Sequence, residues 1–565
     1  MVSRRSRSSS ADLGLIREWF DKCTKHHKRC KENMHSWFPT RLLSLGPKGR
    51  YIRLIITKDN PPNGPYMTLS HRWTEERYTK LQSSTAMQLQ QAIDVVRLPK
   101  TFQDAVRVCR HLNIHYLWID SLCIKQDEND LSDWVEESQR MGQVYSSACL
   151  NVSATRSFDG SGRLLGGSSW ASKVPTQIEV GTDDSSQKYY VIDGDLWDDE
   201  IESAPLLRRA WVYQERYLAH RIIHFGESQL GWECLESRML EMFPKGLPPS
   251  LGISDAKLSG YTPVTTTSPS SSTSFPDTQF AEEWQRLMCQ YSKCELTYPS
   301  DKLIALDGIA KIKMMDRQDD TYVAGMWKST ALYDLPWWRW DDDRTQFPIH
   351  TTSFRAPSWS WASVDGDIHF PLRFGVFSKV QESYADVKTL VGHTTDQNGN
   401  TAVSGEIQIE GICLPLRVQW QENEEPKSFT IPGFRFSTHK WTLKSSIYLE
   451  APAEVVGSFS DSGKLLLLPL FVTRHTLFGI VLATTHGISA HQRIGAIEIA
   501  IMGLTIPTPV HRKDKRLFIE TKPQASTAFR EDAQDTEAQI WSRAALKFIH
   551  YLREQRPHSR LITIL

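Results

Sequence analysis

Apolar residues in the first third of the chain form short strand-like runs separated by stripes of helical period. The runs "YMTLS" (66–70), "HYLWID" (115–120) and "CLNVSAT" (149–155) have the length and apolar content of buried strands. Between the first two lies a helical stripe made of Phe102, Ala105, Val106, Cys109 and Leu112. A second helical pattern begins at about residue 130 and precedes the third run. Strand, helix, strand, helix and strand in this order predict a parallel α/β sheet.

Other patterns flank this α/β segment. They predict a helix at 12–35, a strand at 51–57, a helix at 205–218, a hairpin at 221–234 that turns at Gly226-Glu227-Ser228, and helices over 280–335. From about residue 405, short β runs broken by Gly and Pro predict a β-rich sandwich or barrel-like domain. A last helix at 533–555 precedes the strand-like "LITIL".

These patterns divide the chain into five parts. We predict an N-terminal helix and strand at 1–62, an α/β domain at 63–240, a disordered Ser/Thr/Pro-rich linker at 255–279, a helical region with a Trp-rich segment at 280–365, and a β-rich C-terminal domain at 366–565.

Polar residues follow two of the predicted parallel strands directly. Ser70 ends the first strand and Asp120 ends the second. In open parallel sheets, ligands bind outside the carboxyl ends of the strands. Ser70 and Asp120 are therefore candidate ligand contacts.

One carboxylate lies on the apolar face of the helix that follows residue 130. At 100° per residue, a single arc of about 100° holds Trp134, Glu137, Met141, Val144, Tyr145 and Ala148. Glu136 projects to the opposite side, where a solvated charge is expected. Burying Glu137 costs several kcal/mol unless a partner compensates it. The pattern leaves two interpretations open, a buried ion pair with an arginine and an acid that lines a cleft.

Two further groups carry candidate chemistry. Cys23, His27 and Cys30 share a helical face at i, i+4 and i+7, which supplies three zinc ligands. The spacing shows no fourth ligand, so no metal site is assigned. Trp211 and Glu215 share a face at i, i+4. Glu215 is either a second functional acid or, as the neighbouring arginines favour, part of a salt bridge.

Composition narrows the class of protein. The 565 residues include 66 basic and 66 acidic side chains, so net charge gives no support for a nucleic-acid or acidic-membrane partner. No apolar run approaches the roughly 20 residues of a membrane helix. The nine cysteines form no CxxC pair and several, such as Cys123, lie among apolar residues. Such inert buried thiols are typical of a reducing compartment, which predicts a cytoplasmic or nuclear protein.

Three blocks of the sequence resemble the fungal heterokaryon-incompatibility (HET) domain. They are "YMTLSHRW" (66–73), the segment from "LPKTF" to "VSAT" (98–155), and "LLRRAWVYQERYLAHRIIHFGESQLGWEC" (206–234). The blocks occur in order, and the domain proper covers about 66–216. The sequence departs from the family pattern at His71-Arg72 and at Thr74.

The resemblance implies a fold and a process. HET proteins mediate non-self recognition between fungal strains and trigger programmed cell death. Their domain is similar to the Toll/interleukin-receptor (TIR) domain, so the expected fold class is α/β, with a TIR/flavodoxin-like parallel-sheet HET domain, a helical middle region and a C-terminal β-rich domain.

The TIR likeness also implies a reaction. Enzymatic TIR domains hydrolyse NAD with a Glu on a helix that carries a Trp upstream, and "DWVEE" (133–137) resembles the start of that helix. On this reading Glu137 is catalytic, NAD is the substrate, and neither cofactor nor metal is required. The expected ligand contacts are Ser70, Arg72, Trp73, Asp120 and Trp134.

The alternative is a non-enzymatic signalling module. Adaptor TIR domains act by self-association or by binding other proteins, and Glu137 would then be a structural ion pair. Both readings predict protein partners or self-association, and neither requires nucleic acid or a membrane.

Overall fold

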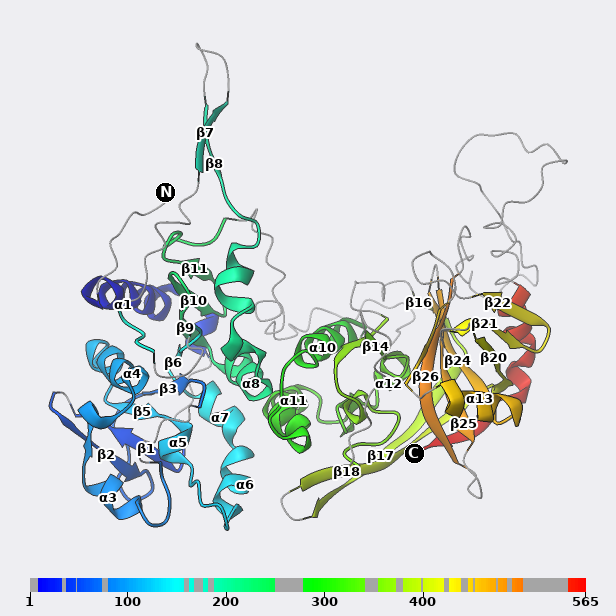
Figure 1. The fold of residues 1–565 in the computed structure, drawn as a ribbon, viewed down its shortest axis with the longest axis horizontal. Helices are drawn as coiled ribbons and strands as arrows, with labels where there is room; N and C mark the ends of the chain where they lie inside the picture. Colours follow the sequence, from blue (N-terminus) through cyan, green and yellow to red (C-terminus); the bar gives the residue numbers. More distant parts are fainter. Residues whose placement is uncertain are drawn as a thin grey trace. The chain divides into compact units, whose positions relative to one another are not determined.

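The computed structural model divides the chain into two compact units (Figure 1). Unit 1 comprises Met1–Ser268 and Cys294–Lys313, and unit 2 comprises Pro269–Lys293 and Met314–Leu565. The structure describes residues 9–32, 37–46, 48–73, 80–156, 162–166, 176–180, 187–248, 278–340, 354–371, 380–397, 400–420, 426–437, 446–450, 453–473, 476–484, 490–500 and 547–565.

A nine-stranded mixed sheet forms the centre of unit 1. Its strands in spatial order are β11 (Arg238–Leu240), β10 (Leu230–Cys234), β9 (Arg221–Phe225), β6 (Leu150–Ser153), β3 (Tyr66–Ser70), β5 (Tyr116–Trp118), β1 (Arg41–Ser44), β2 (Tyr51–Ile56) and β4 (Ile93–Asp94). A separate hairpin pairs β7 (Thr176–Val180) with β8 (Gln187–Val191).

The four central strands of this sheet are parallel. Strand β3 pairs in parallel with β5 on one side and with β6 on the other, and β6 pairs in parallel with β9. Numbered along the chain, these strands have the spatial order 2-1-3-4, which is the flavodoxin-like order. The predicted parallel α/β sheet is therefore confirmed. The order reverses between β3 and β6, and the carboxyl ends of strands at such a reversal are where α/β sheets bind ligands.

Helices cover the sheet on both sides (Figure 1). The helices of unit 1 are α1 (Ser9–His26), α2 (Arg29–Glu32), α3 (Ala86–Gln91), α4 (Lys100–His111), α5 (Asp120–Cys123), α6 (Ser132–Ser138), α7 (Met141–Ser146), α8 (Ala210–Leu218) and most of α11 (Ile304–Asp316), with short 3-10 or π turns at Val95–Arg97, Asp198–Glu202, Pro205–Arg208 and Pro299–Lys302. Helices α1 and α4 contact each other on one side, and α7 and α8 contact each other on the other.

Two predicted helices are each broken into two. The helix expected at 12–35 stops at His26, and α2 starts three residues later. The helix expected from about residue 130 divides between Ser138 and Met141. At this second break the amide of Arg140 bonds to the carbonyl of Glu137 three residues back (3.0 Å), which tightens the turn and reorients α7.

Unit 2 combines helices with antiparallel strands. Its first part holds α10 (Thr278–Tyr291), α12 (Ala331–Asp334), a 3-10 turn at Trp361–Ser363, and the pairs β12 (Tyr322–Val323) with β13 (Met326–Trp327) and β14 (Trp338–Trp340) with β15 (Asp367–His369). The middle region is therefore helical, with short strands that the sequence analysis did not predict.

The remainder of unit 2 is β-rich, as predicted. One sheet contains β16 (Val380–Ser383), β17 (Ala385–Gln397), β18 (Asn400–Gly411), β19 (Leu414–Pro415), β23 (Ser446–Leu449), β24 (Leu465–Thr473), β25 (Thr476–Thr484), β26 (Ala490–Ala500) and β27 (Arg560–Ile564). A second contains β20 (Arg417–Trp420), β21 (Pro426–Ile431) and β22 (Phe434–Ser437), and α13 (Ala453–Asp461) packs nearby. Their shared core includes Phe429, Leu467 and Phe548.

Parts of two predictions fall outside the described residues. The linker predicted at 255–279 lies outside the described residues except for its last two positions, which are the first two residues of α10. Of the helix predicted at 533–555, the structure describes residues 547–555, and these are helical. Among the described helices, none has both the length and the apolar character that crossing a bilayer requires.

Candidate functional site

A buried polar cluster lies at the carboxyl end of β3, where the strand order reverses. The hydroxyl of Ser70, the last residue of β3, donates a hydrogen bond to Oε2 of Glu215 on α8. The amide Nδ2 of Asn151 on β6 donates to Ser70 Oγ (2.9 Å). The hydroxyl of Tyr145 on α7 also bonds to Glu215. Strands β3 and β6 and helices α7 and α8 thus meet at one carboxyl group.

Glu215 is a buried acid with a strongly perturbed pKa. Burial raises its pKa to about 7, and the negative charge of Asp120 adds to the rise, while the bonds from Ser70 and Tyr145 oppose it. Among the described residues, no Lys, Arg or His lies within ion-pair distance of this carboxylate, in contrast to the expected salt bridge. A pKa near neutrality is the value that suits a general acid or base at physiological pH.

Asp120 forms the more accessible side of the same cluster. It is the first residue of α5 and follows β5 directly. Its Oδ1 accepts from the Ser121 amide (2.7 Å), and its Oδ2 accepts from Nε1 of Trp73 (2.6 Å). About a quarter of the Asp120 side chain (25%) is exposed. The ammonium of Lys80 lies 4.7 Å from the centre of the Trp73 ring. The predicted contacts Ser70, Trp73 and Asp120 are therefore brought together.

His71 adds a buried imidazole to this cluster. Its Nδ1 lies 3.7 Å from Oδ1 of Asp120, and its ring meets the ring of Phe102 edge-on at 4.8 Å. Burial lowers the pKa of His71, so its ring is neutral at physiological pH. Neither ring nitrogen has a hydrogen-bond partner within the described part of the chain. Buried polar atoms are normally satisfied, so these nitrogens are available to a ligand or water.

Two of the predicted ligand contacts, Arg72 and Trp134, lie outside this polar cluster. Arg72 is exposed and makes no hydrogen bond or ion pair with the residues that the structure describes. Trp134 is half-buried on α6, and its ring packs edge-on against Trp211 at 6.1 Å. Neither residue joins the hydrogen-bond network around Ser70.

Glu137 faces inward, as its helical position predicts, and is held by cations. Only 3% of it is exposed. Its Oε1 accepts from Thr40 Oγ1 (2.6 Å) and lies 3.4 Å from Nη1 of Arg140 and 3.7 Å from Nη2 of Arg41. Arg41 also binds both oxygens of Asp133 (2.6 and 2.8 Å). Burial raises the pKa of Glu137, and the bond from Thr40 and the charge of Arg41 oppose the rise. These contacts are those of a structural ion pair.

Outside these groups, one set of potential metal ligands comes together among the residues that the structure describes. Cys23, His27 and Cys30 are joined by Cys234 at the end of β10, and their ligand atoms all lie within 4.8 Å of one another. Sequence spacing could not supply Cys234, because the hairpin β9–β10 brings it there from more than 200 positions away. By contrast, burial raises the pKa of Cys123 to about 12, which agrees with an inert thiol.

The fold and the polar cluster define the class of protein as an α/β domain with flavodoxin-like strand order and a buried acidic site at the strand-order reversal. Residues 66–215 match the family described as Heterokaryon incompatibility protein (HET). This segment of the chain is therefore a HET domain. The match starts at the first residue of β3 and ends at Glu215, so it contains the whole Ser70–Asp120–Glu215 cluster. No curated protein and no solved structure matches the chain significantly.

Proposed function

We propose that this chain is a cytoplasmic effector of fungal non-self recognition that triggers regulated cell death, and that its HET domain hydrolyses NAD. The observation that carries the enzymatic part is Glu215, a buried acid with a pKa of about 7 at the strand-order reversal. Its carboxyl group accepts hydrogen bonds from hydroxyl groups and forms no ion pair among the described residues.

The proposed reaction divides between two carboxyl groups. Breaking the nicotinamide–ribose bond develops positive charge on the ribose, which a fixed carboxylate stabilises. Asp120 is accessible enough to meet the ribose, and Trp73 beside it offers an aromatic surface. Water adds to the ribose carbon, and its proton passes through Ser70 to Glu215, whose pKa suits a general base at neutral pH. The products are nicotinamide, ADP-ribose and one proton.

The test is release of nicotinamide from NAD by the full-length protein at high concentration, where self-association is favoured. We expect Glu215→Gln to reduce turnover by about 10²-fold or more. Glu137→Gln, which keeps the hydrogen bond from Thr40, and Glu128→Gln, at an exposed position, should retain activity. Absence of turnover by the unaltered protein, or full activity of Glu215→Gln, would contradict the enzymatic proposal.

A non-enzymatic signalling module is the second candidate, and the ion pairs of Glu137 favour it. They account for the inward carboxylate of α6 without catalysis. Glu137→Ala leaves Arg41 and Arg140 without this partner, and we expect a loss of about 2–4 kcal/mol in unfolding free energy. Glu136→Ala, which removes an exposed partner of Arg140, should cost below about 0.5 kcal/mol.

Cell death separates the two candidates. If Glu215→Gln abolishes both nicotinamide release and killing on expression in a fungal host, the effector acts through its reaction. If that variant folds normally and still kills, the signalling candidate is correct.

A further inference from the structure

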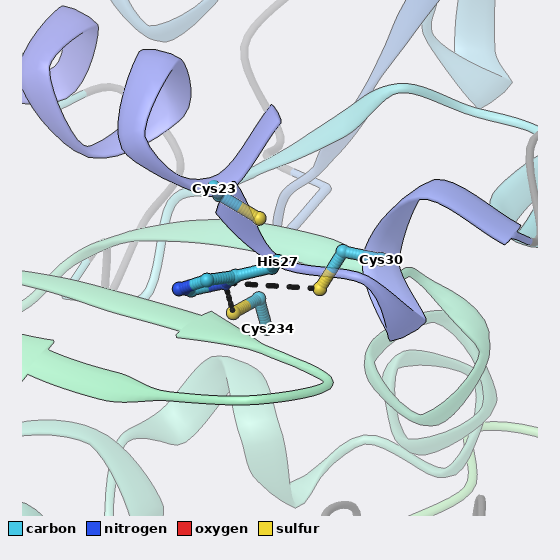
Figure 2. A group of neighbouring side chains, drawn as sticks. All are labelled: Cys23, His27, Cys30 and Cys234. Atoms are coloured by element: carbon cyan, nitrogen blue, oxygen red, sulfur yellow. Dashed lines mark hydrogen bonds between the residues drawn. The ribbon is translucent and has the colours of Figure 1, made fainter. Parts of the chain in front are cut away.

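Four sulfur and nitrogen ligands converge outside the matched HET segment (Figure 2). Cys23 comes from α1, His27 from the segment after it, Cys30 from α2, and Cys234 from the end of β10. The three cysteines are buried, and His27 is half-buried. In Figure 2 the three sulfur atoms and the imidazole surround a common point.

The spacing of the ligand atoms suits a tetrahedral metal ion. Zinc binds thiolate sulfur at about 2.3 Å and imidazole nitrogen at about 2.0–2.1 Å, so the edges of its tetrahedron are about 3.5–3.8 Å long. Nδ1 of His27 lies 3.3 Å from Sγ of Cys234 and 4.0 Å from Sγ of Cys30. All four ligand atoms lie within 4.8 Å of one another. A small contraction around an ion completes the geometry.

The break between α1 and α2 makes this convergence possible. A continuous helix would carry Cys23, His27 and Cys30 along one line at i, i+4 and i+7. The helix instead ends at His26, and α2 starts at Arg29 in a new direction. The turn lets Cys30 face back toward Cys23 across His27.

Arg221 supplies the charge that a metal–thiolate centre needs. It is buried (1% exposed), and its Nε donates to Sγ of Cys23 (3.2 Å). Its Nη2 donates to the carbonyl of Cys30 (2.7 Å) and its Nη1 to the carbonyl of Cys149 (3.3 Å). Among the described residues, no carboxylate pairs with this guanidinium. A zinc ion with three thiolates and one neutral imidazole carries a net charge of −1, which Arg221 neutralises.

We propose that Cys23, His27, Cys30 and Cys234 form a structural zinc site. Four protein ligands leave no open position, which is the arrangement of structural rather than catalytic zinc. Sulfur-rich tetrahedral sites favour zinc over the oxygen-binding cations. Three ligands precede the matched segment and one follows it, so the ion ties the N-terminal helices to the hairpin β9–β10. Its role is to close the two flanks of the HET domain onto each other.

The primary test is the zinc content of freshly purified full-length protein by elemental mass spectrometry. We expect about one zinc per chain. Removing zinc with a strong chelator should lower the melting temperature of unit 1, and cobalt added to the stripped protein should give the visible absorption of a tetrahedral thiolate centre.

Matched variants locate the ion. Cys234→Ser should reduce zinc content about tenfold or more, whereas Cys109→Ser, at a buried cysteine of α4 outside the cluster, should retain it. His27→Cys keeps four ligands and should retain zinc, and His27→Ala should weaken it. Because His27 is only half-buried, its two variants test the position of the zinc ion even if Cys234→Ser does not fold.

Three results would overturn the proposal. The first is unaltered protein that stays free of zinc after zinc supplementation with all three thiols of the cluster reduced. The second is unchanged zinc content in Cys234→Ser, which places the ion elsewhere. The third is a disulfide among the three cysteines in non-reducing peptide maps. Because the readouts are metal content and stability, they do not depend on the NAD reaction.

Discussion

Two inward-facing glutamates of the HET domain differ in what surrounds them. Glu137 accepts from Thr40 and lies near two arginines, so its charge is compensated. Glu215 has hydroxyl partners and a second acid nearby, so its charge is disfavoured. The same residue type therefore lies beside cations in one place and beside hydroxyl groups and a second acid in the other.

The raised pKa of Glu215 predicts a pH-dependent stability. Its folded pKa of about 7 lies above its ordinary value of 4.5, so the folded state favours the protonated form. The contribution of protonated Glu215 to the free energy of unfolding is complete below about pH 4.5 and is lost as the pH rises through 7. The total loss is on the order of 3 kcal/mol. In Glu215→Gln that loss is absent, so its melting temperature should rise relative to the unaltered protein between pH 6 and pH 8.

Asp334 in unit 2 provides the control for this measurement. Burial raises its pKa to about 7 as well, and it accepts from Thr330 Oγ1 (2.6 Å) and Gln285 Nε2 (2.7 Å). Asp334→Asn should change the pH dependence of unit 2 and leave that of unit 1 as it was. Equal pH profiles for Glu215→Gln and the unaltered protein would show that Glu215 does not titrate near neutrality.

Local sequence patterns predicted the positions of some of these residues and not of others. The inward position of Glu137 follows from helical spacing, and Ser70 and Asp120 follow from their places at strand ends. The environment of Glu215 depends on β3 and α7 meeting α8, and the place of Cys234 depends on the β9–β10 hairpin. These are contacts between distant segments, which no window of the sequence contains.

At the scale of elements, two helices approach each other through glycine. A Cβ on Gly142 of α7 would lie 2.8 Å from Cα of Gly308 on α11, and a Cβ on Gly308 would lie 2.7 Å from Cα of Gly142. The Gly308 amide also donates to Oε1 of the buried Gln214 on α8 (2.6 Å). The absence of side chains at both positions thus allows α7, α8 and α11 to pack together.

We expect Gly142→Ala to destabilise unit 1 by about 1–3 kcal/mol, because the added methyl group meets backbone atoms that cannot move independently. Gly14→Ala on α1 is the matched control. Its Cβ would meet nothing within 4 Å, so the higher helix propensity of Ala should leave stability equal or raised by about 0.5–1 kcal/mol. Chemical denaturation measures both, and similar effects of the two changes would contradict the close packing.

Sequence pattern was most reliable for the buried parallel strands. The short apolar runs that predict β3, β5 and β6 are found as strands in the fold, because strands buried in a parallel sheet carry apolar residues on both faces. The breaks at His27 and Gln139 were missed because the apolar period continues across them while the backbone turns. Strand β17, which starts at Ala385, was also missed, since its polar sequence lacks a clear apolar face.

At the scale of the whole molecule, unit 1 is built from two separated segments. Residues 294–313 return to it after α10 of unit 2. The carbonyl of Glu295 accepts from the Ala210 amide (3.0 Å), and the carboxylate of Asp301 accepts from Trp211 Nε1 (3.0 Å). Helix α8, which carries Glu215, is therefore supported by chain that lies beyond the matched HET segment.

This arrangement predicts that a fragment ending at Pro248 is incomplete. This fragment exposes Gln214 and leaves Trp211 without Asp301 as its hydrogen-bond acceptor. The melting temperature of the fragment should therefore rise when a peptide of residues 294–316 is added in trans. The same peptide with Gly308→Leu should fail to stabilise it, because Gly308 packs directly on Gly142. Equal effects of the two peptides would mean that the segment does not dock as the structure has it.

The split of unit 1 also orders events during translation. Domains generally fold as they emerge from the ribosome, at synthesis rates of about 5–20 residues per second. The nascent HET sheet is complete once β11 has emerged, yet α8 waits several seconds more for residues 294–313, which follow α10. During synthesis the acidic centre around Glu215 therefore emerges before the segment that supports α8, and unit 1 acquires its final form only after α10 of unit 2 has been made.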